Sequence, residues 1–211
     1  MVRMILLIWI VSCSAHAVCL EDISLCSQSG VYYQSKGQAS YGGQPIIKKI
    51  NATSGVPRGT SMEQASIHIK NYLPESYHEI MLKVVSHESK GRQLAIGINS
   101  KKIKLERQPQ SLDEAVQWSE ALINAGYSID MGYAQINSQH IKPGGKFYKL
   151  GITVTDLFDP RINLLAGAKI YGDAHNMSNG DIVRALSIYN TGHSERGIKN
   201  GYVSAVLGQR N

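Results

Sequence analysis

Several sequence features that would identify common classes of protein are absent or scarce in this chain. The 211 residues contain only three cysteines, and no histidine or further cysteine completes a metal-binding set around Cys19 and Cys26. No helix-turn-helix, zinc-finger or aromatic-basic pattern is present, so nothing indicates a nucleic-acid partner. Internal repeats are missing, and strand-like alternation is sparse. We therefore expect no bound metal, no nucleic acid and no repeat architecture.

The composition is that of a globular protein with a mainly helical pattern. Hydrophobic residues make up 43% of the chain and charged residues 18%, which excludes a disordered protein. The length suits one domain with additional processing segments. Apolar residues recur mostly at helical spacing, so the predicted class is mainly α with at most a small β-hairpin. The net charge of +6 favours anionic partners but does not identify one.

A short apolar run at the N-terminus predicts a secretory signal peptide. Arg3 precedes the run Met4–Val11, and Ala15-His16-Ala17 follows as a cleavage site. Residues 1–17 are therefore the predicted signal peptide. The run is too short to cross a bilayer comfortably, so we expect no stable membrane span.

The same region permits a second interpretation. Ile10-Val11-Ser12-Cys13 resembles a bacterial lipoprotein cleavage box, and processing there would leave a lipidated Cys13. If cleavage instead follows Ala17, Cys19 and Cys26 remain in the mature chain and could pair in an oxidising compartment. Both alternatives predict export.

The rest of the chain divides into two parts. Residues 27–60 are rich in Gly, Ser, Gln and Lys without a helical or alternating period, so 18–60 is a predicted irregular lead-in. Residues 61–211 form the predicted folded domain. Helices are predicted over Ser61–Tyr72, from Pro74 to before Gly91, from Ser111 to Gly126, from Asp159 through Ile170, over Asp181–Tyr189 and over Ile198–Leu207.

Local patterns support two of these helix starts and one close contact. Ser111 and Glu114 form a capping box, in which each side chain would bind the other's backbone N–H. Asp159 precedes Pro160, which is a favourable residue in a first helical turn. The small residues Ala166-Gly167-Ala168 would let another helix approach closely.

Glu88 occupies an unusual position at the end of the second predicted helix. Steps of three and four residues lead from Tyr77 through Met81 and Val84 to Glu88, so a carboxyl group continues an apolar face. Burial disfavours the charged form and would raise the pKa, which suits a proton donor in glycosidic bond cleavage. The alternative is that Glu88 ends the helix and points into water.

Three segments together resemble a known family. His87-Glu88-Ser89-Lys90, Asp130 to Ser138 and Ala185 to Gly192 contain, in order, a Glu-Ser pair, a Gly-x-x-Gln-Ile-Asn segment and a Tyr-Asn-x-Gly segment. These resemble the lytic transglycosylases of the lysozyme-like superfamily, especially the specialised enzymes of type IV secretion and conjugation machines. The resemblance extends over residues 73–206, including Gly201-Tyr202-Val203 near the end.

The resemblance implies a lysozyme-like fold with a substrate cleft, and a periplasmic enzyme that acts on peptidoglycan strands. It implies cleavage of the β-1,4 bond between N-acetylmuramic acid and N-acetylglucosamine, with a 1,6-anhydro product and no cofactor. Glu88 would act as both acid and base. The implied partners are components of a type IV secretion or conjugation machine.

Six further residues are predicted to bind substrate. Ser89 could bond near the carboxyl group or bond its own helix backbone. Gln135 and Asn137 offer amides for N-acetyl and hydroxyl groups. Tyr189 could direct its hydroxyl at Glu88 or pack in the core. The remaining two are Gly132, which would permit a sugar to approach the backbone, and Asn190, which would cap its segment or contact sugar.

Asp130 leaves two alternatives open. The segment from Asp130 to Ser138 also resembles animal-type lysozymes, in which this aspartate is a second carboxylate, so a hydrolase using Glu88 and Asp130 is possible. Asp130 could instead cap the turn before Gly132 through backbone amides. A non-catalytic wall-binding assembly factor is a further alternative, although the presence of Glu88, Gln135 and Tyr189 argues against it.

Overall fold

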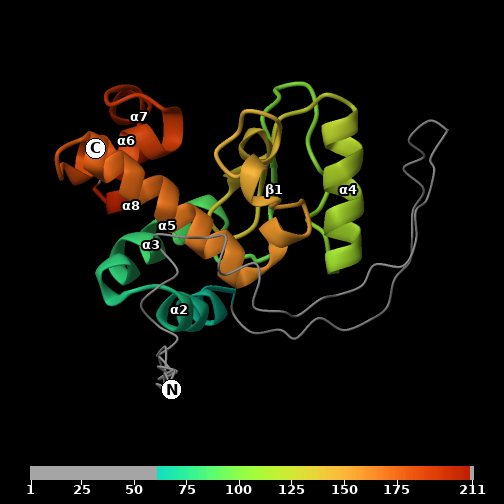
Figure 1. Cartoon of the computed structure of the whole chain (residues 1–211), viewed down its shortest axis with the longest axis horizontal. Helices are drawn as coiled ribbons and strands as arrows, with labels where there is room; N and C mark the ends of the chain where they lie inside the picture. The colour runs from blue at the N-terminus through green and yellow to red at the C-terminus, as the bar shows by residue number, and fades with distance from the viewer. Residues whose placement is uncertain (1–60, 210–211) are drawn as a thin grey trace, which may run out of the picture.

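The computed structural model describes residues 61–209, which form a mainly helical fold with one small sheet (Figure 1). The predicted signal peptide, the lead-in and Cys13, Cys19 and Cys26 lie outside the described residues. The elements are α2 Ser61–Tyr72, α3 Glu75–Glu88, β1 Ile96–Ile98, α4 Leu112–Asn124, β2 Ile129–Met131, β3 Ile136–Asn137, the short 3-10 helices η1 Ser138–Ile141, η2 Tyr148–Leu150 and η3 Asp156–Phe158, then α5 Pro160–Met177, α6 Ile182–Thr191, α7 Arg196–Lys199 and α8 Tyr202–Leu207.

Helix α5 crosses the middle of the molecule and packs against α2 and α3 from the start of the described chain and against α6 from its C-terminal part. Helices α6, α7 and α8 lie on one side of it, and α4 with the sheet lies on the other (Figure 1). The prediction of a close approach at Ala166-Gly167-Ala168 is confirmed. A Cβ on Gly167 would lie 2.6 Å from Cβ of Ala134 and 2.9 Å from Cε of Met81. This glycine therefore brings α5 against both α3 and the turn after β2.

The sheet is antiparallel, with the strand order β1-β2-β3. Gly97 pairs with Asp130, and Asp130 pairs with Asn137, so the central strand holds Asp130 between two neighbours. Gln108 covers the outer edge of β1, because its amide accepts from the Ile96 N–H at 2.7 Å and donates to the Ile96 carbonyl oxygen at 3.0 Å. The mainly α prediction is confirmed, and the expected hairpin is extended by a third strand.

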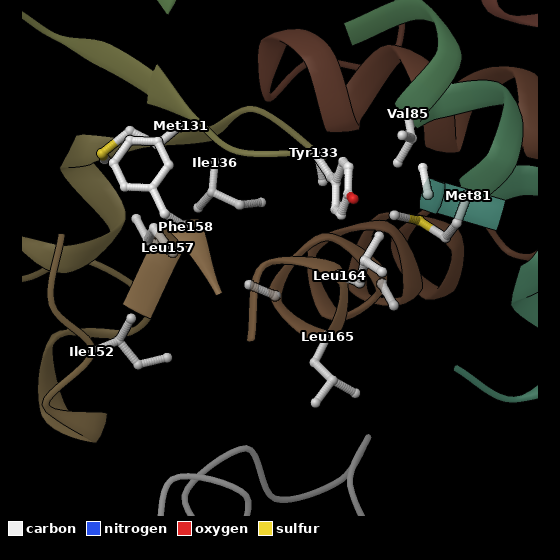
Figure 2. Close-up of a cluster of buried hydrophobic side chains, with 14 of the residues drawn as sticks. Met81, Val85, Met131, Tyr133, Ile136, Ile152, Leu157, Phe158, Leu164 and Leu165 are labelled. Carbon is white, nitrogen blue, oxygen red and sulfur yellow. The ribbon is translucent and has the colours of Figure 1, made fainter. Parts of the chain in front are cut away.

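Two clusters of buried side chains form the core. The larger cluster joins α2, α3, the sheet and α5, and Figure 2 shows Met81 of α3, Tyr133 of the turn after β2 and Leu164 of α5 directed into it. The smaller cluster contains Val84 of α3 and Tyr202 of α8, together with residues of α5 and α6. Since α3 contributes to both clusters, its C-terminal end lies where they meet.

The predicted helix caps are largely confirmed. The Ser111 hydroxyl accepts from the Glu114 N–H at 3.2 Å, and Asp159 caps α5 ahead of Pro160. The capping box is not reciprocal, however. The Glu114 carboxylate accepts from the Gln110 N–H at 2.8 Å and pairs with Arg107, whose charge attracts it more strongly than a neutral amide.

Two details of the C-terminal region differ from the prediction. The expected helix over Ile198–Leu207 is divided into α7 and α8, because Gly201 adopts a left-handed φ of 82° that a continuous helix does not allow. Ile182 is at helical spacing from Ala185 and Leu186, which predicts an inward position on α6, but its exposed fraction is 47%. Within residues 61–209, no helix is both long enough and apolar enough to cross a membrane.

Candidate active site

The C-terminal end of α3 places Glu88 beside the core. Met81 and Val84 on the same face are fully buried, and Glu88 itself is half-buried. The chain turns away soon afterwards, because Gly91 adopts a left-handed φ of 70°. A Cβ at this position would lie 2.5 Å from the carbonyl oxygen of Ser61. The turn after Glu88 therefore packs directly against the start of α2.

Tyr202 makes the hydrogen bond to Glu88 that we expected from Tyr189. The Tyr202 hydroxyl donates to Oε1 of Glu88 at 2.6 Å. The position of Tyr202 is determined by two neighbours: Oδ1 of Asn200 accepts from its backbone N–H at 3.0 Å, and the His87 ring packs edge-on against it with 4.9 Å between centroids. Tyr202 is thus a site residue for which the sequence alone supplied no role.

Tyr189 instead connects α6 to the turn between β2 and β3. Its hydroxyl donates to the Ala134 carbonyl oxygen at 2.8 Å, so of the two alternatives for Tyr189 the structure has packing within the protein and not the bond to Glu88. Burial, together with the negative charges of Glu88 and Asp130, raises the pKa of the Tyr189 hydroxyl well above its usual value. Tyr189 therefore lies within electrostatic reach of both carboxyl groups while its proton is held by the backbone.

The environment of Glu88 favours a protonated carboxyl group. Burial raises its pKa to about 7, from an ordinary value of 4.5. The hydrogen bond from Tyr202 opposes this effect because it stabilises the carboxylate, whereas the negative charge of Asp130 adds to it. Acid and base forms are therefore both populated near neutral pH, so one group can donate a proton and later accept one.

Asp130 lies on β2 with both carboxyl oxygens bound by side-chain amides. Its Oδ1 accepts from Nδ2 of Asn137 at 2.7 Å, and its Oδ2 accepts from Nδ2 of Asn99 at 2.9 Å. Burial raises the pKa of Asp130, and the two hydrogen bonds partly offset the increase. The amides from neighbouring segments take the place of the turn-capping contacts considered for Asp130 from the sequence.

The amide groups of Gln135 and Asn137 are also used within the protein. Nε2 of Gln135 donates to the carbonyl oxygens of Ala95 at 3.1 Å and Gly132 at 2.8 Å. Gln135 also adopts a left-handed φ of 47°, which is uncommon outside glycine. These bonds orient both side chains. Their contact with N-acetyl or hydroxyl groups of a substrate stays a prediction.

Gly132 makes room for a buried asparagine. A Cβ on Gly132 would lie 2.2 Å from Nδ2 of Asn163, which donates to the carbonyl oxygens of Met131 at 2.8 Å and Leu157 at 2.7 Å. Oδ1 of Asn163 accepts from the Ala134 N–H at 2.8 Å. Because Gly132 has no side chain, Asn163 of α5 can lie close to its backbone. Contact of Gly132 with a sugar stays a prediction.

Ser89 and Asn190 both make hydrogen bonds to other protein groups near the candidate site. Ser89 is fully buried, and its hydroxyl donates to the Val85 carbonyl oxygen at 3.2 Å, as in the backbone-bonded alternative. Asn190 is exposed, and its Oδ1 accepts from Nδ2 of Asn200 at 3.0 Å. Since Asn200 also binds the Tyr202 backbone, this bond connects the end of α6 to the residue that contacts Glu88.

The fold therefore gathers two carboxyl groups and two tyrosines from four separate elements. Glu88 comes from α3, Asp130 from β2, Tyr189 from α6 and Tyr202 from α8. In the part of the chain that the structure describes, no three His, Cys, Asp or Glu side chains gather as metal ligands do. The chemistry that the arrangement itself offers is proton transfer at Glu88.

Comparison with known proteins gives a family match and several relatives. The family model described as Transglycosylase SLT domain matches residues 67–208. The type IV secretion system protein virB1 of Brucella abortus biovar 1 is 32% identical over 142 residues, which cover 61% of this chain and 56% of that protein. Protein virB1 of Agrobacterium fabrum is 32% identical over 103 residues, covering 46% of this chain and 40% of that protein.

The chain spans about half the length of the curated relatives that it matches, 56% and 40% in the two cases above. No solved structure matches it significantly. The family model, by contrast, covers most of the described residues and includes Glu88, Asp130, Tyr189 and Tyr202. The chain therefore belongs to the transglycosylase SLT domain family, which confirms the lysozyme-like resemblance.

Proposed function

We propose that this chain is a peptidoglycan lytic transglycosylase in which Glu88 is the catalytic acid and base. The observation that carries the proposal is the half-buried carboxyl group with a pKa of about 7, hydrogen-bonded by Tyr202. A glycosidic oxygen is a poor leaving group until it is protonated, so a carboxyl group that remains partly protonated at neutral pH meets the first requirement of the reaction.

In the first step, the protonated carboxyl of Glu88 gives its proton to the oxygen that links N-acetylmuramic acid to N-acetylglucosamine. The bond from C1 of the muramic acid to this oxygen breaks, and the N-acetylglucosamine leaves with a hydroxyl group. Positive charge develops on the muramic acid ring, as in other glycosidic cleavages. The Tyr202 hydroxyl stabilises the carboxylate that is left on Glu88.

In the second step, the Glu88 carboxylate takes the proton from the C6 hydroxyl of the same muramic acid. The C6 oxygen forms a bond to C1, which closes a 1,6-anhydro ring and returns Glu88 to its protonated form. No water is consumed, and the substrate itself supplies the nucleophile. A single acid/base residue is therefore sufficient.

The bonds of Asp130 favour this reaction over hydrolysis with two carboxylates. A retaining hydrolase needs a second carboxylate that is ionised and free to attack C1. Both oxygens of Asp130 are occupied by the amides of Asn99 and Asn137, so neither is free to attack C1. We assign Asp130 the role of keeping the proton on Glu88 through its negative charge.

The wider role rests on the relatives. The Brucella and Agrobacterium proteins carry the name virB1, and the Brucella protein is named as part of a type IV secretion system. We propose that this chain likewise acts in the periplasm and opens the wall locally for such an apparatus. The proposal includes export by residues 1–17 and contact with components of that machine.

Digestion of purified peptidoglycan followed by mass analysis tests the reaction. We expect fragments that end in anhydro-muramic acid, each lighter by one water than a hydrolysed fragment. Fragments with the hydrolysed mass would instead support the muramidase alternative with Asp130.

The variant Glu88→Gln tests the assignment of the catalytic residue. The amide keeps the shape of the side chain but has no proton to transfer, so cleavage should be lost while the far-ultraviolet circular dichroism stays that of the native chain. Cleavage that persists in this variant would remove Glu88 from the mechanism. A wild-type chain that binds the wall without any cleavage would support the assembly-factor alternative.

A further inference from the structure

The segment between β1 and α4 presents three lysines to solvent. Lys101, Lys102 and Lys104 are exposed, and none of them takes part in a salt bridge within residues 61–209. Arg107 on the same segment is already paired with Glu114. Glu106 offsets only one of the three lysine charges, so the segment has a net positive charge that the described protein does not neutralise.

The lysine segment, residues 99–108, is held in place at both ends. At its start, the Asn99 N–H donates to the Ser128 carbonyl oxygen at 3.0 Å, and the Ser100 hydroxyl accepts from the Lys102 N–H at 3.1 Å. At its end, Gln108 makes two hydrogen bonds to the backbone of β1. Leu105, between the lysines and Gln108, packs against the larger core cluster. The lysines thus project from an anchored backbone.

The start of this segment is one hydrogen bond away from the candidate active site. Nδ2 of Asn99 donates to Oδ2 of Asp130 at 2.9 Å, and the charge of Asp130 raises the pKa of Glu88. Lys101 follows Asn99 by two residues, a distance of at most about 7 Å along the backbone. The lysine segment therefore begins at the edge of the proposed reaction centre.

We propose that Lys101, Lys102 and Lys104 bind carboxylates on the peptide stems of the wall, so that the substrate is stem-bearing glycan. The proposal rests on the function proposed above and adds a substrate class to it. An extended stem of four residues spans about 14 Å, which exceeds the backbone distance of at most about 7 Å between Asn99 and Lys101. Flexible ammonium groups suit carboxylates whose positions vary along a mobile peptide.

Carboxylates on peptidoglycan come from two sources, which an amidase separates. Removing the stems leaves one lactyl carboxylate attached directly to each muramic acid. In intact strands the lactyl group is instead bound in an amide to the stem, so the carboxylates are those of the stem. Binding of both kinds of soluble strand should be measured at low ionic strength with the full chain carrying Glu88→Gln, so that the strands are not cut. Intact strands are expected to bind more tightly than stripped strands.

The test variant adds Lys101→Gln, Lys102→Gln and Lys104→Gln to that chain. Exposed ion pairs contribute little individually, so we expect the affinity ratio of intact to stripped strands to fall by a factor on the order of ten or less. The matched control replaces Lys70, Lys142 and Lys149 by Gln. It removes the same total charge from lysines outside the segment that make no salt bridge within residues 61–209, and it should keep the ratio of the parent chain.

Three outcomes would overturn the proposal. The first is that the parent chain binds intact and stripped strands with equal affinity. The second is that the test variant loses the same affinity for both kinds of strand. The third is that the control variant changes the affinity ratio as much as the test variant does. Loss of binding to vesicles of anionic phospholipid, with the strand ratio kept, would assign the lysines to a membrane surface instead. Because binding is measured without cleavage, failure of the proposed reaction would appear only in the digestion experiment and is distinguishable from each of these results.

Discussion

At the scale of single residues, two opposing effects determine the acidity of Glu88. Burial raises its pKa, and the hydrogen bond from Tyr202 lowers it, so the value of about 7 reflects both. Without burial, Glu88 would be ionised at neutral pH and could not act first as an acid. Without Tyr202, the carboxylate formed in the proposed first step would lose its stabilising donor.

Tyr202→Phe separates these two effects. Removing the donor destabilises the carboxylate, so the pKa of Glu88 should rise above about 7, and the alkaline limb of the pH–rate profile should move to higher pH. The rate at the optimum should fall about tenfold or more, because a hydrogen bond to a charged group is lost. Tyr171→Phe, at another tyrosine in the same cluster, is the control and should leave both quantities unaffected. An alkaline limb that stays in place would show that Tyr202 does not act on the carboxyl group.

The same pKa predicts how stability depends on pH. The folded protein binds the Glu88 proton more tightly than the unfolded chain, since the pKa is about 7 instead of 4.5. The contribution of Glu88 to the free energy of unfolding is therefore fully present below pH 4.5 and decreases through the interval up to about pH 7, by up to about 3 kcal/mol. Glu88→Gln should lack this decrease. Urea unfolding of both proteins at about pH 4 and about pH 8 measures the difference, which should favour the variant only at the higher pH.

Two fully buried serines form a matched pair for testing polar burial. The hydroxyl of Ser119 on α4 has no hydrogen-bond partner among the described residues. The hydroxyl of Ser187 on α6 donates to the His193 carbonyl oxygen at 2.6 Å and accepts from the Gly197 N–H at 2.8 Å. Ser119→Ala should stabilise the protein by about 1 kcal/mol, whereas Ser187→Ala should destabilise it by about 1–3 kcal/mol. Thermal unfolding measures both changes in stability. A change of the same sign in the two variants would contradict the difference in hydrogen bonding between the two serines.

At the scale of elements, the contact between α5 and the turn after β2 positions the site. The carbonyl oxygen of Ala134 in this turn accepts a hydrogen bond from the Tyr189 hydroxyl, and the Ala134 side chain packs against Gly167 of α5. Gly167→Ala should destabilise the protein by about 1–3 kcal/mol, because the new Cβ would lie 2.6 Å from that of Ala134. Gly172→Ala, on the same helix, meets mainly the movable hydroxyl of Tyr77 and should be nearly neutral. Denaturant unfolding of both variants tests this, and equal losses would mean that helix α5 does not depend on the close contact.

The sequence was sufficient where local chemistry determines an element. The caps at Ser111 and Asp159 and the helix end near Gly91 follow from residues within a few positions of each other, and the structure confirms them. The apolar face that ends in Glu88 is equally local, since it depends only on helical spacing.

The partners of the site residues could not be derived in this way, because they join distant segments. Tyr202 lies 114 residues from Glu88, and no periodicity relates the two. Tyr189 lies within electrostatic reach of Glu88, but the direction of its hydroxyl depends on how α6 packs over Ala134. A tyrosine directly after the turn glycine Gly201 was the available indication that a side chain there points back toward the core.

At the scale of the whole molecule, the site combines residues from elements that are far apart in the sequence. Helix α3 carries Glu88, the proposed acid, and contributes to both hydrophobic clusters, so movement of either cluster would displace Glu88. The second carboxyl group comes from the sheet, and the tyrosine donor comes from the C-terminal helix. Loss of the C-terminal helix would therefore affect the pKa of Glu88 as well as the stability of the smaller cluster.

The net charge of +6 gives a final prediction that belongs to the molecule as a whole. Peptidoglycan is anionic, so attraction over distances longer than a contact should contribute to binding. The screening length falls from about 10 Å at 0.1 M salt to about 3 Å at 1 M, so affinity for purified wall should decrease as salt rises over this range. Oligomers of N-acetylglucosamine carry no charge, and their binding should be nearly independent of salt. Sedimentation of the chain with wall and fluorescence titration with the oligomers give the two salt dependences. If both were flat, short-range contacts alone would account for binding, and the excess of lysine and arginine would have no part in it.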